Sequence, residues 1–410
     1  MRALLWLACV LPVSAVAAPW SFTDPVTVAG ADGPPHFHHL DGAGRRHVAA
    51  SATEVALIWE DDRSGAPQVY MAVKPLAARS FERRHQLSDG EDAYEPAIVA
   101  LGDGRWAAAW EQDGSVMARV IDAAGPGPLH QLAANARQVT LAAGRDGRLA
   151  AVWAQGRDGG QLIEATELSI DDKDLAAPTA PMVVAPVDEH PFQGYPAAAW
   201  SSEGLLLVAW EDRRAGHTRL FHSWREPDQP FAPERQLNEH SAPSADSGED
   251  IRLGSGVMRV MLAVDADDTV RTIWLDKRNA ASGYAVWGAA SRDGGRTFGR
   301  NEIVQDDLGA AVAQWHASLA GGQPGFAAVW DDAREGWADP NETGDVLLSW
   351  HDGGAWSPDL VVPGASGDGY QGSPAVAFDA NGGLHLVWIE RDTLSSPTRL
   401  RYMHGVSVPP

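Results

Sequence analysis

The chain has 410 residues, with 55 acidic and 32 basic side chains, and its formal net charge is −23. Such an acidic surface repels nucleic-acid phosphates and anionic membranes, so we expect no nucleic-acid partner. Cys9 is the single cysteine, which excludes internal disulfides.

The first residues have the pattern of a secretory signal peptide. Arg2 precedes an apolar run over 3–13, and small residues follow to Ala18. We expect a signal peptide over 1–18, cleaved after Ala17 or Ala18, and one domain over 19–410. A retained anchor or a lipidated Cys9 is the alternative. The expected location is therefore periplasmic or secreted, with no membrane insertion after cleavage.

A Trp-centred motif recurs seven times along the rest of the chain. Each copy has an apolar run, a Trp, and then acidic and basic residues, as in Val55–Arg63 and Leu206–Arg214. A unit of about 55 residues is typical of a four-stranded propeller blade with long loops. The seven tryptophans, which we expect in the core, are Trp59, Trp110, Trp153, Trp210, Trp274, Trp330 and Trp388.

Each copy also predicts a succession of antiparallel strands. An apolar stretch such as Pro96–Ala100 is followed by a Gly-containing turn at 102–104 and then by the strand that ends in the Trp motif. Third strands such as Gln68–Val73 and short fourth strands such as Gln86–Leu87 complete the unit. No stretch after the leader shows sustained helical periodicity.

The two ends of the predicted domain complement each other. The last copy stops after its third strand, and Trp20–Val28 has no hairpin partner of its own. Placed beside Leu400–Met403, this N-terminal strand completes the last blade and removes an exposed sheet edge. We therefore predict an all-β chain forming a seven-bladed β-propeller of four-stranded antiparallel blades, with six blades as the alternative because the third copy is weak.

Between the third and fourth strands of one copy lies the segment Ser-Arg-Asp-Gly-Gly-Arg-Thr-Phe. Its Ser291, Asp293, Gly295, Thr297 and Phe298 match the Asp-box, also called the BNR repeat, so the mature chain resembles the sialidase-like β-propeller superfamily. The resemblance implies a structural role for these five residues: Asp caps the turn, Gly adopts positive φ and the aromatic ring packs in the blade.

The resemblance also implies that ligands bind where second strands lead into third strands and where the chain enters each first strand. Charges after the Trp are expected to pair as Asp62–Arg63, Asp212–Arg213, Asp276–Arg278, Asp332–Arg334 and Glu390–Arg391. Loop residues before the first strands differ between blades, as an asymmetric ligand site requires. Our ligand-binding candidates are His38, His39, Tyr94, Glu95, Tyr195, Arg213, His316 and Tyr370.

Metal binding has only weak support in the sequence. His36 and His38 lie on one side of an extended segment, but two or three histidines do not complete a coordination shell. Acidic turns at Asp265–Asp268 and near Asp306 make calcium the one cofactor to consider, although the spacing of a calcium loop is absent. We expect no metal and no cofactor.

Two functions remain open on the sequence. We favour an exported, non-catalytic module that binds a glycan, peptide or partner protein, because propellers commonly host such sites. The alternative is a sialidase-like glycoside hydrolase, which the resemblance implies would need a Tyr nucleophile with a Glu partner, an acid/base Asp and three Arg. The early Arg-Ile-Pro element of true sialidases is absent, and Arg45-Arg46 is the only basic pair there. Arginines tied to acids of their own blades would favour the binding module.

Overall fold

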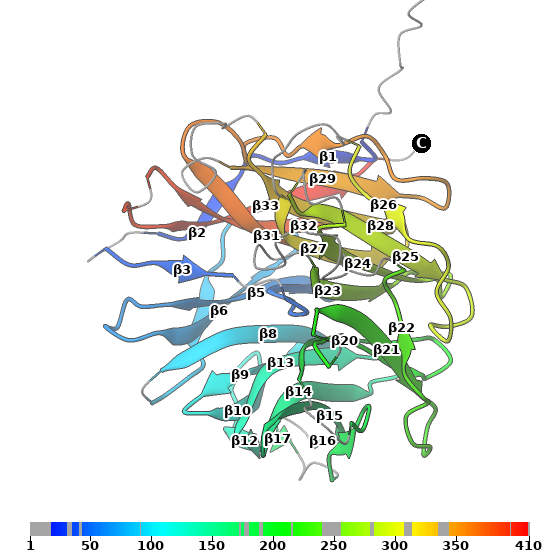
Figure 1. Cartoon of the computed structure of the whole chain (residues 1–410). Helices are drawn as coiled ribbons and strands as arrows, with labels where there is room; N and C mark the ends of the chain where they lie inside the picture. Colours follow the sequence, from blue (N-terminus) through cyan, green and yellow to red (C-terminus); the bar gives the residue numbers. More distant parts are fainter. Residues whose placement is uncertain are drawn as a thin grey trace, which may run out of the picture.

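The computed structural model is an all-β propeller (Figure 1). It describes residues 18–30, 35–40, 43–90, 92–171, 174–175, 180–187, 192–214, 216–239, 256–278, 283–306, 314–334, 344–393 and 395–408. The predicted signal peptide lies outside these residues except for Ala18. Within the described ranges, there is no helix with the length and apolar character needed to cross a membrane.

Seven antiparallel sheets form the blades. Blade 1 consists of β3 (His38–His39), β4 (Val48–Ala50), β5 (Glu54–Asp61), β6 (Gln68–Pro75) and β7 (Arg83–Gln86). Blade 2 consists of β8 (Ala93–Gly102), β9 (Arg105–Gln112), β10 (Ser115–Asp122), β11 (Gly125–Pro126) and β12 (His130–Ala134). Blade 3 consists of β13 (Ala136–Ala143), β14 (Leu149–Arg157), β15 (Gly160–Leu168) and β18 (Met182–Val183), with a small hairpin of β16 (Ile170–Asp171) and β17 (Asp174–Leu175). The weak third copy is therefore a full blade.

The remaining blades repeat the same four-stranded order. Blade 4 consists of β19 (Gln193–Trp200), β20 (Leu206–Asp212), β21 (Arg219–Arg225) and β22 (Arg235–Gln236). Blade 5 consists of β23 (Val257–Val264), β24 (Val270–Asp276), β25 (Ala285–Ser291) and β26 (Glu302–Ile303). Blade 6 consists of β27 (Gln314–Gly322), β28 (Gly325–Asp332), β29 (Asp345–His351) and β30 (Leu360–Val361). Blade 7 consists of β31 (Tyr370–Phe378), β32 (Leu384–Arg391) and β33 (Arg399–Ser407), completed by β1 (Trp20–Phe22) and β2 (Val26–Ala29).

The ring closes as the sequence predicts. Strand β2 pairs antiparallel with β33, Val26 opposite Tyr402, and β1 continues the pairing with Trp20 opposite Ser407. Figure 1 shows these blue N-terminal strands beside the red C-terminal strand. The innermost strands contact one another in the order β4, β8, β13, β19, β23, β27 and β31, and β31 contacts β4 again. Seven blades thus surround one central channel.

The hydrophobic core lies between adjacent blades. All seven motif tryptophans are at most 1% exposed, which confirms their predicted place in the core. Trp110, for example, packs in one cluster with Ile58 and Met71 of the preceding blade. A buried Trp removes on the order of 200 Å² of side chain from water, so one Trp per blade supplies much of the inter-blade stability.

Candidate functional site

The end of the second strand carries a hydrogen-bonded unit of Trp, Asp and Arg. In blade 1, Trp59 Nε1 donates to Asp61 Oδ2 over 2.8 Å, and Arg63 Nε lies 2.8 and 2.9 Å from the two Asp61 oxygens. Residues two apart on a strand point to the same side, so this spacing lets the three side chains meet. The same Asp–Arg pair recurs in blades 4, 5 and 6 as Asp212–Arg214, Asp276–Arg278 and Asp332–Arg334.

This alternation corrects three of the predicted pairs. Arg63 binds Asp61 rather than Asp62, and Asp212 binds Arg214 rather than Arg213, because the sequence neighbour of each partner points the other way. The third is blade 7, where Glu390 accepts a hydrogen bond from Arg399 over 3.0 Å instead of pairing with Arg391. The pairs Asp276–Arg278 and Asp332–Arg334 are confirmed, at 2.6 Å each. Four arginines that follow the motif Trp, and Arg399 of blade 7, are thus bound by acids of their own blades.

Each first strand of blades 2 to 7 contains a bulge at the same end of the channel. The pairing register shifts there, and one non-glycine residue adopts a left-handed backbone with φ between 47° and 60°. These residues are Glu95, Gln138, Tyr195, Arg259, His316 and Ser373. Bulges re-aim side chains and are frequent beside functional sites. Three of the predicted ligand-binding residues, Glu95, Tyr195 and His316, are therefore bulge residues at the channel end.

Side chains from the preceding blade cap several bulges. Glu60 accepts the Glu95 N–H over 3.1 Å, Glu111 accepts the Gln138 N–H over 2.6 Å, and Glu211 accepts the Arg259 N–H over 2.7 Å. Each of the three acceptors directly follows the motif Trp of its blade. These three glutamates fix the geometry of the bulges and line the end of the channel with carboxylates.

Blade 1 departs from the others and closes the channel. Between β3 and β4 the chain leaves the sheet, and residues 43–47 reach across the axis. Gly44 O accepts a hydrogen bond from Thr140 of blade 3 over 2.6 Å, and Arg46 donates to Leu262 O of blade 5 over 2.8 Å. Arg45 is 1% exposed and forms ion pairs with Glu95 and, over 3.2 Å, with Glu111. We call residues 43–47 the plug.

The plug leaves a cavity on its other side. This cavity of about 340 Å³ is lined by Arg46 and by small residues further along the innermost strands, such as Ala143, Ala199 and Gly321. It contains none of the predicted ligand-binding residues. The polar bulge end is therefore the candidate ligand site, and we call it the channel mouth.

Two candidates from different blades meet at one carboxylate of the channel mouth. His316 Nδ1 lies 2.8 Å from Asp331 Oδ1, and the Tyr370 hydroxyl donates to Asp331 Oδ2 over 3.2 Å. Burial, together with the Asp331 charge, raises the pKa of Tyr370. This hydrogen-bonded line of His316, Asp331 and Tyr370 connects blades 6 and 7.

Exposed aromatic rings lie at the starts of two other blades. Tyr94 is 37% exposed and directly precedes the bulge of blade 2, and Phe192 is 44% exposed and directly precedes blade 4. The guanidinium carbon of Arg213 lies 5.1 Å from the centre of the Phe192 ring, and Arg213 Nε donates to Thr218 Oγ1 over 3.1 Å. First strands run in one direction along the channel, so both rings lie at the mouth end.

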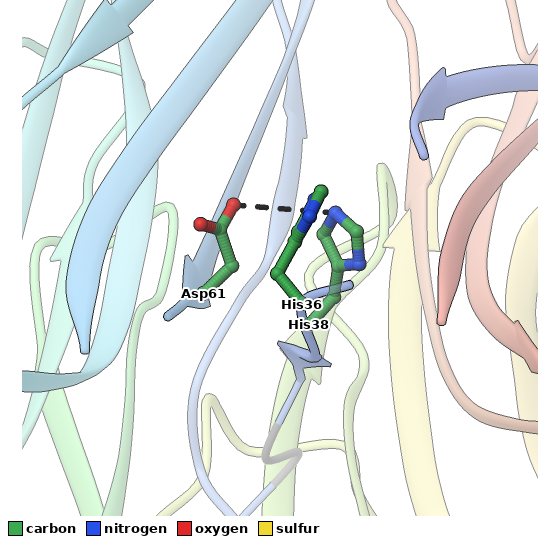
Figure 2. A group of neighbouring side chains, drawn as sticks. All are labelled: His36, His38 and Asp61. Carbon is green, nitrogen blue, oxygen red and sulfur yellow. Dashed lines mark ion pairs between the residues drawn. The ribbon is translucent and has the colours of Figure 1, made fainter. Parts of the chain in front are cut away.

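The remaining candidates, His38 and His39, lie on β3 at the boundary between blades 1 and 7, where His39 is opposite Glu60, one of the acids of the channel mouth. His38 is buried, its Nδ1 is 2.8 Å from Thr398 Oγ1, and His39 is exposed. Figure 2 shows His36 and His38 side by side, facing Asp61. His38 Nε2 lies 4.0 Å from Asp61 Oδ2, and burial lowers the pKa of His38 to about 4. Both Asp61 oxygens already accept hydrogen bonds from Arg63, so Asp61 is explained by the repeated unit.

The Asp-box segment forms a turn between β25 and β26, at the opposite end of the blade. Asp293 Oδ1 accepts hydrogen bonds from Ser291 Oγ over 2.7 Å and from the Thr297 N–H over 2.8 Å. Gly295 has φ 91°, and Phe298 packs edge-on against His222 of blade 4. These contacts hold the turn and dock it on the neighbouring blade, so the segment lies far from the channel mouth.

Sequence reasoning missed four residues of the mouth: Arg45, Glu111, Phe192 and Asp331. For Glu111 and Asp331 a signal was present, because an acid directly after the Trp recurs in blades 1, 2, 4 and 6. Burial and the neighbouring Glu95 carboxylate raise the pKa of Glu111 to about 7, against the opposing effect of Arg45. The mouth is therefore rich in carboxylates, and Arg45 is already neutralised there.

Comparisons with known proteins agree with this architecture. No family model matches the chain, and no curated protein matches its sequence. A PL25 ulvan lyase structure bound to -[GlcA(1-4)Rha3S]- is 9% identical, with a TM-score of 0.55 over 93% of this chain and 95% of that one. The polysaccharide lyase Uly1 is 8% identical, with a TM-score of 0.54 over 89% and 90%. The sialidase of Trypanosoma rangeli is 12% identical, with a TM-score of 0.43 over 78% and 56%. Identities this low show the fold alone, and that fold is the β-propeller that the repeats predict.

Proposed function

We propose that this protein is a non-catalytic binding module for a neutral glycan, which docks at the channel mouth. The observation that carries the proposal is the state of the arginines. Arg63, Arg214, Arg278 and Arg334 are bound by acids of their own blades, and Arg45 is bound by Glu95 and Glu111. A carboxylate ligand at any of these five arginines would have to compete with the charge-assisted hydrogen bonds, which disfavours sialic and uronic acids. Arg213 at the mouth has no acidic partner among the described residues and instead packs on the Phe192 ring and donates to Thr218 Oγ1.

The other groups of the mouth are well suited to sugar hydroxyls and ring faces. Carboxylates such as Glu111 and Asp331 accept hydrogen bonds from hydroxyl groups. The exposed rings of Tyr94 and Phe192 offer apolar faces on which a pyranose can pack. The polar groups differ from blade to blade, so the surface can distinguish one end of a saccharide from the other.

The test is a binding screen of the purified chain against neutral and acidic oligosaccharides, followed by titration calorimetry of the best ligand. We expect Tyr94→Ala and Phe192→Ala each to weaken binding about fivefold, since one aromatic contact contributes about 1 kcal/mol. Val361→Ala is the matched control, because Val361 is 43% exposed but lies on the outer strand β30. Unchanged affinity in both aromatic variants, or a preference for acidic glycans, would contradict the proposal.

A second candidate, a glycan-cleaving enzyme, is favoured by one observation. Asp331 holds His316 and Tyr370 in a single hydrogen-bonded line, which places three proton-transfer groups together. A screen for both hydrolysis and elimination of polysaccharides decides between the two functions. Turnover that is lost in Tyr370→Phe would establish the enzyme, and absence of turnover on a glycan that binds would support the module.

We also propose that the protein acts outside the cytoplasm, on the basis of the signal-peptide pattern over 1–18. Expression of the full chain in a bacterial host, with mass determination of the product in each compartment, tests this. A product in the periplasm or medium that starts at Ala18 or Pro19 is expected. An uncleaved product that stays in the cytoplasm would refute export.

A further inference from the structure

Blade 7 brings together an Asp and two His from three places in the sequence. Asp379 follows β31, His385 lies on β32, and His404 lies opposite His385 on β33. His385 Nε2 is 3.2 Å from Asp379 Oδ2, and His404 Nε2 is 3.9 Å from the same oxygen. The three ligand atoms all lie within 4.8 Å of one another. A tetrahedral Zn²⁺ with bonds of about 2.0–2.1 Å separates its ligand atoms by roughly 3.3 Å, which is close to the observed spacing. The two imidazole rings are stacked with their planes 3° apart, so one ring has to rotate about its Cβ–Cγ bond before both Nε2 lone pairs reach the same ion.

The surrounding contacts hold Asp379 and His385 in place. Asp379 Oδ1 accepts the N–H groups of Asn381 and Gly383, both over 2.8 Å, and this directs Oδ2 to the imidazoles. His385 Nδ1 lies 2.7 Å from the Tyr402 hydroxyl. A hydroxyl can donate or accept, so Tyr402 can also support the tautomer in which Nε2 is free to bind a metal.

Two further features fit a ligand between these side chains. His404 Nε2 is buried and has no hydrogen-bond partner among the residues described, which is costly for a polar atom. Gly383 leaves open the space beside the three side chains. A Cβ at position 383 would lie 2.5 Å from Asp379 Oδ2 and 2.7 Å from His404 Nε2. The backbone of Gly383 does not have positive φ, so the absence of a side chain is required by space there.

We infer that Asp379, His385 and His404 form a binding site for a divalent transition-metal ion of the Zn²⁺ class. Two imidazoles and one carboxylate are the donor set that suits such an ion, and three protein ligands leave one coordination position open. His404 and Tyr402 also line a cavity of about 500 Å³ together with Lys74 and Asp24, so the site borders a space that a further ligand can enter. The site lies at the closure of the ring, apart from the glycan site proposed above.

Lys74 is a cation beside the site, and its ammonium contributes positive potential at both imidazole rings, which moderates the affinity for a metal ion.

This group differs from the His36, His38 and Asp61 cluster in one respect. In that cluster both carboxylate oxygens already accept hydrogen bonds from Arg63, and the guanidinium charge repels a cation. Asp379 has no such cation pair among the described residues, and its Oδ2 receives only the histidine contacts. Metal binding is thus expected in blade 7 and not in blade 1.

A bound metal would also reinforce the closure of the ring. The main chain of His404 exchanges hydrogen bonds with Thr23, which connects β1 to β2: Thr23 N donates to His404 O over 2.9 Å, and His404 N donates to Thr23 Oγ1 over 3.2 Å. Fixing His404 to β32 and to the β31–β32 turn therefore stabilises the strand on which the N-terminal segment docks. Binding to the folded state alone raises the unfolding temperature.

The experiment uses the full chain after chelator treatment and dialysis. Titration calorimetry with Zn²⁺ should give one site per chain, Co²⁺ should give the visible absorption of a site with nitrogen ligands, and Zn²⁺ should raise the thermal midpoint. His404→Ala and Gly383→Ala should each abolish the Co²⁺ spectrum and the thermal shift. Tyr402→Phe should weaken binding about 10-fold or more, as expected for a group that orients a ligand.

His130→Ala is the matched control, because His130 forms an exposed pair with Asp174 and is in no three-residue cluster of metal-binding side chains among the described residues. It should bind Zn²⁺ as the unchanged chain does. If Gly383→Ala fails to fold by circular dichroism, His404→Ala decides alone. No saturable Zn²⁺ binding, unchanged binding in His404→Ala, or loss only in His38→Ala would each overturn the inference. Glycan binding is measured separately, so failure here does not depend on the proposed function.

Discussion

The plug can be tested by adding a single methyl group at Gly44. This glycine has φ 73°, and a Cβ built on it would lie 2.1 Å from the carbonyl oxygen of Pro196 in blade 4. Pro196 lies in the bulge of β19 between Gly194 and Ala197, both of which are paired with β20, so the backbone has little room to retreat. Gly44→Ala therefore forces the plug away from the channel wall. Gly65→Ala is the matched control, since Gly65 has φ 91° and no atom lies within 4 Å of the place that its new methyl group would occupy.

Three contributions set the expected magnitude. A non-glycine residue in the left-handed region costs about 1–2 kcal/mol, and this applies to both variants. Displacement of the plug adds about 1–3 kcal/mol for overpacking and about 1 kcal/mol for the Thr140–Gly44 hydrogen bond. We therefore expect Gly44→Ala to lose about 3–6 kcal/mol of unfolding free energy and Gly65→Ala about 1–2 kcal/mol.

The assay is equilibrium unfolding in urea, followed by the fluorescence of the buried tryptophans. The difference between the two variants isolates the contact of the plug with blade 4, because the backbone cost is common to both. Loss of stability in Gly44→Ala that is no greater than in Gly65→Ala would show that residues 43–47 do not pack across the channel as described.

Three further predictions concern the mouth, the repeated unit and the closure. The pKa of Glu111 is raised to about 7 in the folded chain from an ordinary 4.5, so between these pH values the folded chain keeps a proton that the unfolded chain releases. The free energy of unfolding should therefore fall as the pH rises from 4.5 to 7. Glu111→Gln should make this pH dependence weaker, as measured by urea unfolding at several pH values. Asp212→Asn should cost about 2–3 kcal/mol, since it weakens charge-assisted bonds from Arg214, whereas the same change at the exposed Asp228 should be nearly neutral. Trp20→Ala should lower the free energy of unfolding by about 3–5 kcal/mol, because Trp20 is buried and its Nε1 donates a hydrogen bond to Gly382 O. A smaller loss than in Val406→Ala, which changes an exposed side chain, would contradict ring closure by β1.

The repeat made the fold predictable, because each blade buries a Trp at the same position between adjacent sheets. The last copy lacked a fourth strand and the N-terminal segment lacked a partner, so the sequence predicted that these two ends pair with each other, as β1 and β2 do with β33. The pairing inside the blades was harder to predict. Asp62 and Arg63 are neighbours in sequence, but the side-chain alternation of the strand brings Asp61 to Arg63 instead.

The candidate site was only partly predictable, for a related reason. Glu95, Tyr195 and His316 were selected because they vary between blades, and the structure places all three at bulges of the channel mouth. The plug could not be anticipated, since blade 1 departs from the repeat that guided the reasoning. His36 and His38 drew attention because they are close in sequence, whereas His385 and His404 meet only through the register of β32 and β33.

The residue directly after the motif Trp can therefore either hold the scaffold or contribute to the ligand site, and its contacts with the next blade determine which. Glu60, Glu111 and Glu211 follow the motif Trp and use a carboxylate oxygen to accept a bulge N–H of the next blade. Asp331 also directly follows its motif Trp, but its shorter side chain binds His316 of its own blade and Tyr370 of the next blade. Replacing Asp331 with Glu should therefore shift the carboxylate toward the scaffold role and separate His316 from Tyr370. If ligand binding or turnover is unchanged in Asp331→Glu, the line of three groups is structural and the glycan is held by the aromatic rim alone.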